Sequence, residues 1–205
     1  MLLQGNQGQT GKAVGQGQTL GFGEYTEALV TELMPRYYEN TYRGQKFTNL
    51  YASTALTAAS TSAQCVLINP TGSSVNLVLM DAFTSLNAFT ATTTGANICI
   101  GWFACASTPT TIGTLQAPVN CKIGVSVKSQ AIAAPTATVL VAPAYARSIA
   151  GFYADLAAGD IAGIHDDIGG SLIITPGFGV SLFEVNGTAS DITVGVSLTW
   201  DEIPI

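Results

Sequence analysis

The C-terminal part of the chain, residues 170–205, constrains the fold more than any other stretch. From Ile192 to Trp200, apolar side chains occupy every second position, the alternation typical of a strand with one buried face. Two dipeptides that favour turns, Pro176-Gly177 and Asn186-Gly187, interrupt the apolar runs before it. Asn-Gly favours a hairpin, because both central residues of a tight turn take positive φ. We predict a meander of three strands, Leu172–Thr175, Val180–Val185 and Ile192–Trp200.

Runs of β-branched and apolar residues, separated by Pro, Gly, Thr and Ser, continue this pattern back to Phe47. The segment 145–170 is the exception, and it favours a long connection with a short helix near Ile149–Leu156. Eight or nine short strands with frequent turns are typical of a sandwich or a barrel. We therefore predict an all-β, antiparallel, jelly-roll-like sandwich with an extended N-terminal arm and one short helix. The other predicted strands are 46–54, 63–69, 74–83, 96–107, 122–130 and 137–143.

Residues 1–46 differ in character from the rest. The stretch Gly5–Gly23 contains seven glycines and four glutamines, and it has too few apolar side chains to build a core. Residues 24–34 favour a short helix, which Pro35 ends because the residue before a proline avoids the α region. The predicted domains are an arm with a helix, residues 1–46, and a β domain, residues 47–205.

The dipeptide Gly11-Lys12 suggests a phosphate-binding loop, but the surrounding residues do not fit one. The G-x-x-x-x-G-K-[ST] motif needs a glycine where Asn6 stands and a hydroxyl residue where Ala13 stands. The four residues before Gly5 are too few to predict a strand that would support such a loop. We expect no nucleotide and no other cofactor.

The charge content of the chain is low. Charged residues make up 10% of the chain and hydrophobic residues 47%, with a net charge of −6, whereas soluble domains carry about 25% charged residues. Such a surface resists association poorly, so we expect a homo-oligomer or a covering partner; a compact monomer coated with Thr and Ser is the alternative. Lys and Arg form no cluster that would neutralise phosphates, and no apolar run is long enough to span a membrane. We expect neither nucleic acid nor membrane as a partner.

The four cysteines, Cys65, Cys99, Cys105 and Cys121, form no CxxC motif and have no histidine nearby, so a zinc site is not indicated. Cys65, Cys99 and Cys105 lie in apolar runs, where a free thiol packs as a small hydrophobic group. The polar start of the chain does not resemble a signal peptide. We expect mostly buried, reduced thiols, a state that suits assembly in a cytoplasm, although a disulfide remains an alternative.

His165 is the sole histidine, and it is followed by Asp166 and Asp167. A hydrolase would use it as a general base, but no G-x-S-x-G nucleophile motif is present. The carboxylates could hold Ca²⁺, yet the spacing D-x-D-x-D-G is missing. We interpret the cluster as a polar loop tip, and we expect no enzyme activity and no metal site.

Tyrosine and arginine are concentrated in residues 36–43, and both types are frequent at the centres of protein interfaces. We predict that this segment, with apolar residues of the arm, contacts a protein, either a neighbour or its own domain. The tryptophans Trp102 and Trp200 are assigned to the core, with sugar stacking as the alternative. The predicted interface residues are Leu20, Phe22, Leu29, Leu33, Arg36, Tyr37, Tyr38, Tyr42 and Arg43.

The C-terminal stretch is similar to the ends of virion proteins of tailed bacteriophages. In those proteins a strand, a Pro-Gly turn and a strand ending in Trp-x-Glu-x-Pro recur in small jelly-roll domains. The matching residues here are Pro176, Gly177, Trp200, Glu202 and Pro204. The close similarity covers about 35 residues, and the β-rich body is similar in general style.

The resemblance implies a capsid decoration (cement) protein on the surface of the virion, which forms a homotrimer and binds the major capsid protein. Assembly would take place in the host cytoplasm. A fibre, tail or receptor-binding (carbohydrate-binding) jelly-roll module is the alternative. The sequence pattern predicts no long spine helix of the kind found in a tailed-phage major capsid protein. Its arm carries one lysine within residues 1–23, unlike the basic arms of small RNA-virus coats.

Overall fold

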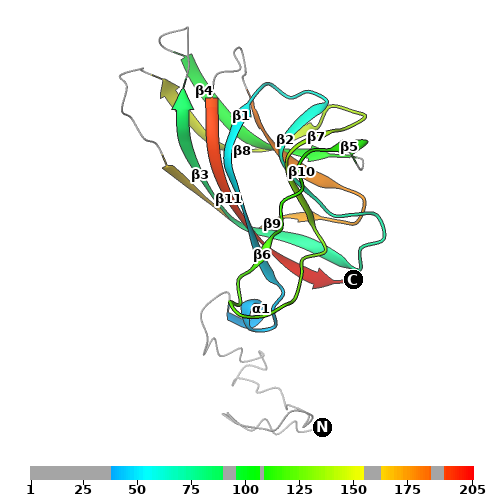
Figure 1. Ribbon diagram of the computed structural model, residues 1–205. Helices are drawn as coiled ribbons and strands as arrows, with labels where there is room; N and C mark the ends of the chain where they lie inside the picture. Colours follow the sequence, from blue (N-terminus) through cyan, green and yellow to red (C-terminus); the bar gives the residue numbers. More distant parts are fainter. Residues whose placement is uncertain (1–37, 90–95, 107–108, 155–162, 186–191) are drawn as a thin grey trace, which may run out of the picture. The chain divides into compact units, whose positions relative to one another are not determined.

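The computed structural model describes residues 38–89, 96–106, 109–154, 163–185 and 192–205 (Figure 1). The chain divides into two compact units, Met1–Glu39 and Asn40–Ile205, and the described residues other than Tyr38 and Glu39 belong to the second unit. The predicted helix 24–34 and most of the predicted arm lie outside the described residues. The arm and domain boundary at residue 46 therefore stays a prediction.

Two antiparallel sheets form the described domain, as the sequence predicts (Figure 1). A five-residue helix, α1 (Tyr38–Tyr42), precedes them. The first sheet contains, in order, β6 (Val119–Asn120), β1 (Lys46–Leu56), β11 (Ile192–Pro204), β3 (Val75–Phe89) and β9 (Gly163–Ile174). The second contains β5 (Thr111–Ile112), β7 (Ile132–Thr138), β2 (Ser62–Ile68), β10 (Gly179–Glu184), β4 (Ala96–Cys105) and β8 (Ala144–Ala154).

The strand order is that of a jelly roll. Four antiparallel pairs, β1 with β11, β2 with β10, β3 with β9 and β4 with β8, make up one long hairpin. Rolling that hairpin places β11 beside β3 and β10 beside β4, which gives two four-stranded sheets connected as Greek keys. The jelly-roll prediction is confirmed by this order, which no local pattern in the sequence specifies.

The segment between β4 and β8 adds three strands to the eight of the roll. β6 extends the first sheet beyond β1, and β5 and β7 extend the second sheet beyond β2. β6 and β5 are two residues long, and short edge strands offer little backbone for pairing with other chains. On the opposite side, β8 shows two register shifts against β4, and β9 shows one against β3. Such bulges interrupt the row of backbone groups that an added strand would need.

The main core lies between the two sheets. Trp102 of β4 and Trp200 of β11 are fully buried there, so the prediction that both tryptophans are core residues is confirmed. Phe47 stacks on Trp200 with 6.3 Å between ring centroids. Tyr51 is buried as well, and its hydroxyl donates a hydrogen bond of 2.9 Å to the carbonyl oxygen of Val66, which satisfies the polar end of an otherwise apolar site.

Part of the outer surface of the second sheet is also buried. Phe103 and Phe183 meet edge to face there, with 5.3 Å between ring centroids, and Tyr145 of β8 packs against Phe103. Val139, in the connection from β7 to β8, belongs to this second cluster. Both faces of β2 and β10 are therefore covered, which explains their continuous apolar runs. The cluster consists of Ala63, Val66, Ile68, Phe103, Cys105, Ala137, Val139 and Phe183.

Asn69 fixes two corners where the chain passes between the sheets. Its side-chain amide donates to the carbonyl oxygens of Val75, at 2.8 Å, and Ile174, at 2.9 Å. Its backbone N–H donates to Phe178, and its carbonyl accepts from Gly177. Gly177 has a φ of 90°, a left-handed value that favours glycine. The predicted Pro-Gly turn therefore exists, and a buried amide holds it in place.

Several sequence predictions are wrong in their details. The Pro-Gly turn joins β9 and β10, which belong to different sheets, so these strands form no hairpin. β10 and β11 also lie in different sheets, which contradicts the predicted meander, and Asn186-Gly187 lies outside the described residues. Two-residue alternation identifies a strand but not its partner.

Two further segments differ from their predictions. The segment expected to hold a short helix near Ile149–Leu156 forms the end of β8 instead, through Ala154. Residues 122–130, predicted as a strand, form turns and irregular structure, with Gly124 at a φ of 92°. Pairing with β4 outweighs the weak helical pattern of the first segment, and turn-forming residues outweigh the apolar content of the second.

Candidate interaction surfaces

The segment that follows β6 lies against the start of β1. The Asn120 side chain donates a 2.7 Å hydrogen bond to the carbonyl oxygen of Gly44. The backbone N–H of Cys121 donates to the carbonyl oxygen of Lys46. Lys122 donates through Nζ to the carbonyl oxygen of Tyr42 at 2.7 Å, and Nζ lies 4.4 Å from the centre of the Tyr42 ring. Figure 1 shows α1 and β6 close together at this end of β1. Residues 120–122 thus hold the end of α1 through backbone carbonyls and a cation–π contact.

Large apolar and basic side chains are exposed at this end. Ile123 is 86% exposed and Tyr42 is 59% exposed. Val127 is exposed as well, beside Gly44. Exposed apolar groups mixed with Arg and Tyr are typical of protein contact surfaces. We call this surface the cationic margin, and it comprises Tyr42, Arg43, Lys122, Ile123, Val127 and Lys128.

The cations of the second compact unit, Asn40–Ile205, are segregated. Residues 40–205 contain five Lys and Arg residues, and all except Arg147 lie in or beside the cationic margin. Lys46 is the buried member, and it forms an ion pair of 2.7 Å with Asp201. The chain contains neither Lys nor Arg after Arg147. The positive charge of the domain is therefore concentrated where β1 begins and β6 ends.

The first sheet has an outer face on which residues align in rows across the strands. One row is Leu50, Ser197, Phe83 and His165, on β1, β11, β3 and β9. The neighbouring row on the same face is Thr48, Thr199, Asp81 and Asp167. β6 adds the exposed Val119 beside Thr48. Small hydroxyl side chains therefore occupy the centre of this face, and larger groups occupy its margins.

Two large apolar side chains project from this outer face. Leu50 is 61% exposed and Phe83 is 49% exposed. A Cβ added at Gly163 would come within 2.8 Å of the Phe83 ring, so the glycine provides the space in which that ring lies. A Cβ at Gly195 would similarly meet the Ser85 hydroxyl at 2.8 Å. Glycine at these two positions allows close packing across the surface of β3.

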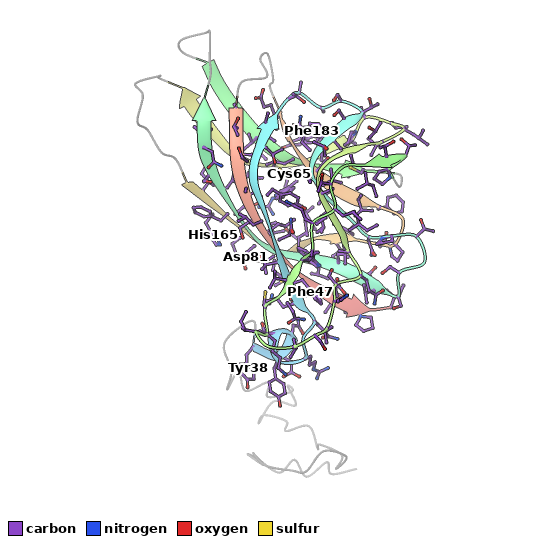
Figure 2. All side chains as sticks on the ribbon, in the orientation of Figure 1. Tyr38, Phe47, Cys65, Asp81, His165 and Phe183 are labelled. Atoms are coloured by element: carbon purple, nitrogen blue, oxygen red, sulfur yellow. The ribbon has the colours of Figure 1, made fainter. Side chains whose placement is uncertain are left out.

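His165 and the two aspartates after it do not form one site. His165 lies within β9 rather than at a loop tip, which corrects the sequence interpretation, and its side chain is 61% exposed. Its Nε2 atom is 3.2 Å from Oδ1 of Asp81 (Figure 2). Strand alternation places Asp167 on the same outer face and Asp166 on the inner side. We call Asp81, Phe83, His165 and Asp167 the acidic margin.

Asp166 connects the two sheets instead. Its Oδ1 accepts a 2.7 Å hydrogen bond from Nη2 of Arg147, and its Oδ2 accepts one of 3.3 Å from the indole nitrogen of Trp102. Arg147 also donates to the hydroxyl of Ser171 at 2.8 Å. Asp166 lies on β9, whereas Arg147 and Trp102 lie on β8 and β4. The buried carboxylate thus connects the edges of the two sheets and has a structural role.

Two adjacent acids of β11 are buried at the other end of the sheet. Asp201 is paired with Lys46 and also accepts a 2.7 Å hydrogen bond from the Asn40 side chain. Glu202 accepts hydrogen bonds from the Ser129 hydroxyl, from the N–H groups of Gln130 and Ala131, and from the Trp200 indole. The Trp-x-Glu motif therefore anchors surrounding chain segments rather than forming a binding site.

The cysteines are free in the described residues, and Cys65 and Cys105 are buried, which confirms the prediction for those two. Burial raises the pKa of the Cys65 thiol to about 12. Burial likewise raises the pKa of Cys105 and Cys121. A thiol that stays protonated is a poor nucleophile and a poor metal ligand.

Two kinds of feature are absent from the part of the chain that the structure describes. No group of three or more His, Cys, Asp and Glu side chains in this part is arranged to hold a metal ion. No helix among the same residues is long and apolar enough to cross a membrane.

The predicted interface residues fall into two groups. Leu20, Phe22, Leu29, Leu33, Arg36 and Tyr37 lie outside the described residues. Tyr38, Tyr42 and Arg43 are described and exposed, and their role in an interface stays a prediction. Sequence reasoning misses Lys122, Ile123, Val127 and Lys128, because the apolar content of their segment favours a strand. Gly124 and the two flanking lysines were the available signals of an exposed loop.

Comparisons with known proteins add little to this picture. No protein-family model matches the chain, and no curated protein matches it. A chain in the solved structure of deformed wing virus carrying the GFP gene is similar over 98% of this chain and 94% of its own length, with 9% identity and a TM-score of 0.26. The fold assignment rests on the strand order rather than on this likeness.

Proposed function

We propose that the protein is a structural component of a virus particle, a capsid decoration (cement) protein of the tailed-phage type. The supporting observation is the jelly-roll strand order in a chain with few charges and with exposed apolar groups at Leu50, Phe83 and Ile123. Jelly rolls build viral capsid domains, although lectins and cupins share the fold. A particle surface would cover such apolar groups.

In the proposed mechanism, the β domain self-associates on the particle while the arm lies across neighbouring capsid subunits. The major capsid protein is the proposed partner, and a trimer is the proposed oligomer. Ordering a Gly-rich arm costs about 1–2 kcal/mol per residue in backbone entropy. A repetitive lattice offsets that cost because each arm meets many identical contacts.

The alternative, a fibre or receptor-binding module that recognises carbohydrate, has less support. Sugar rings stack on exposed aromatic groups, but Trp102 and Trp200 are fully buried in the core. A sugar site would have to use other aromatic residues, such as Tyr145 or Phe178, which are exposed.

The decisive experiment compares binding to purified particles that lack the protein. The full chain is expected to bind at hundreds of copies per particle, as counted by quantitative mass spectrometry. A truncation beginning at Tyr38 should bind far more weakly, since it lacks residues 1–37 of the arm. This boundary keeps Lys46 and Asn40, which neutralise and hydrogen-bond the buried Asp201, and circular dichroism of the truncated chain checks that a loss of binding does not reflect unfolding.

Three outcomes would overturn parts of the proposal. Equal binding by both chains would remove the arm from the mechanism. A dozen copies or fewer per particle would indicate a fibre or tail component. Failure of any shell to form without the protein would make it a shell-forming subunit instead of a decoration.

A further inference from the structure

We propose that the β domain associates head to tail, with the cationic margin of one copy docked on the acidic margin of the next. This inference rests on the proposed self-association and names the surfaces that make it. The two margins carry opposite charge and lie at opposite sides of one sheet, near β6 and on β3 and β9. Because they are different surfaces, a contact between them is heterologous and repeats from copy to copy, which closes into a ring when the rotation allows.

The two margins are complementary in charge. The cationic margin contributes Lys122 and Lys128, together with Arg43. The acidic margin contributes Asp81 and Asp167, which lie beside each other in the register of β3 and β9. Charges of one sign gathered on each surface steer the two surfaces together and disfavour contacts between like surfaces. The contact of a margin with its own copy is therefore the less favourable arrangement.

Both margins also offer apolar area. Ile123, Val127 and the Tyr42 ring are exposed on the cationic margin. Phe83 is exposed on the acidic margin. A stable contact buries about 800 Å² on each partner, with apolar groups at its centre and charges around it. The composition of the two margins fits that arrangement.

The geometry of the sheet supports contact through margins and faces rather than through added strands. Five strands spaced about 4.8 Å apart place β6 and β9 about 19 Å from each other, so the two margins can engage different neighbours at once. The bulges of β8 and β9 and the two-residue lengths of β5 and β6 weaken edge-to-edge pairing. Side-chain contact between the two margins does not depend on edge-to-edge pairing.

The test is sedimentation velocity of the full chain at about 10 mM and about 1 M salt, where the Debye length is about 30 Å and about 3 Å. The wild type is expected to associate at low salt and to dissociate at high salt. Asp81→Lys and the double variant Lys122→Glu/Lys128→Glu should each weaken association roughly tenfold or more, because the first removes the net negative charge of the acidic margin and the second gives the cationic margin a net negative charge.

Mixing the two variants provides the strongest check. Each variant retains one native margin, so the cationic margin of Asp81→Lys can dock on the acidic margin of the double variant, and the mixture should recover association that neither shows alone. Asp167→Lys is a second acidic-margin variant in case Asp81→Lys does not fold, as judged by circular dichroism. Ala142→Lys and Ala142→Glu change charge at an exposed position between β7 and β8 and should leave association within about twofold of the wild type.

The inference is overturned by a wild-type protein that stays monomeric at low salt, by charge-reversal variants that associate normally, or by a mixture that recovers nothing. The proposed function is judged separately by binding to particles. A monomer that decorates particles would overturn the inference alone, whereas a salt-sensitive oligomer that binds no particle would overturn the decoration role alone.

Discussion

Two acid-bearing regions of the same sheet have opposite surroundings. At the end of β11, Asp201 and Glu202 are buried and bonded to residues 40–46 and 129–131. On β3 and β9, Asp81 and Asp167 face outward, and Asp81 is near the exposed ring of His165. The comparison shows that, in a chain with few ions, position divides the carboxylates into buried ones that hold the fold together and others that lie on the outer face of the sheet. Substitutions in the two regions should therefore differ in what they change.

The largest expected effect comes from Asp201→Asn. It leaves the Lys46 ammonium buried without its counter-charge, and removing one partner of a buried pair costs about 3–5 kcal/mol. The measurement is the free energy of unfolding from urea denaturation. The double variant Lys46→Met/Asp201→Asn removes both charges and should regain a large part of the loss. A cost below about 1 kcal/mol for Asp201→Asn would show that water reaches the pair.

Glu202→Ala should destabilise the domain by about 2–3 kcal/mol. It leaves the N–H groups of Gln130 and Ala131 and the Ser129 hydroxyl without their acceptor, and an unsatisfied buried donor costs about 1–3 kcal/mol. Limited proteolysis is the second measurement, since cleavage within residues 121–131 should become faster. Unchanged proteolysis with unchanged stability would contradict the anchoring role of this carboxylate.

A third test concerns a buried acid that is kept neutral rather than paired. Burial raises the pKa of Cys65 to about 12, so between pH 9 and 12 the folded chain retains a proton that the unfolded chain has released. Stability contributed by this group is therefore present below the unfolded pKa and is lost as pH rises, with a slope of up to about 1.4 kcal/mol per pH unit. Burial also raises the pKa of Tyr51 well above its ordinary value, which adds to the slope at the alkaline end.

The measurement is the free energy of unfolding as a function of pH, for the wild type and for Cys65→Ala. The variant is expected to be less stable near neutral pH because it leaves a small cavity. Its alkaline slope should nevertheless be shallower than that of the wild type. Parallel curves would mean that the Cys65 thiol ionises as readily in the folded chain as in the unfolded one.

The smallest stability effect is expected for Asp81→Asn. The exposed pair with His165 contributes little, so the change in the free energy of unfolding should stay below about 0.5 kcal/mol. Thermal unfolding monitored by circular dichroism measures it. A cost close to that of Asp201→Asn would erase the distinction between the two regions.

The sequence predicts the local features of this fold well and the long-range ones poorly. Alternation from Ile192 to Trp200 correctly predicts β11, and the apolar surroundings of Trp102 correctly place it in the core. Partner choice is not encoded locally, so the turn residues favour a hairpin of β10 with β11 although these strands lie in different sheets. The turn residues between β9 and β10 are as compatible with a corner between two sheets as with a hairpin within one sheet.

The interaction surfaces could be predicted only in part. Tyr42 and Arg43 are visible in the sequence as a cluster of interface-type residues, but Lys122 and Ile123 join them through folding alone. The row that aligns Leu50 with Phe83 and His165 arises from the register of four strands. The adjacency of His165 and Asp166 in the chain suggests a single cluster, yet strand alternation separates the two side chains.

The pairing of β1 with β11 also determines when the domain can fold. Phe47 lies opposite Trp200 in the register, so the first strand of the roll cannot complete its side of the sheet until the last strand has left the ribosome. Domains dominated by such distant pairings fold slowly, on the order of milliseconds to seconds. Until β11 has been synthesised, β1 and β3 lack the strand that lies between them in the folded sheet. The nascent chain is consequently at its most vulnerable to wrong association just before its own C-terminal strand arrives.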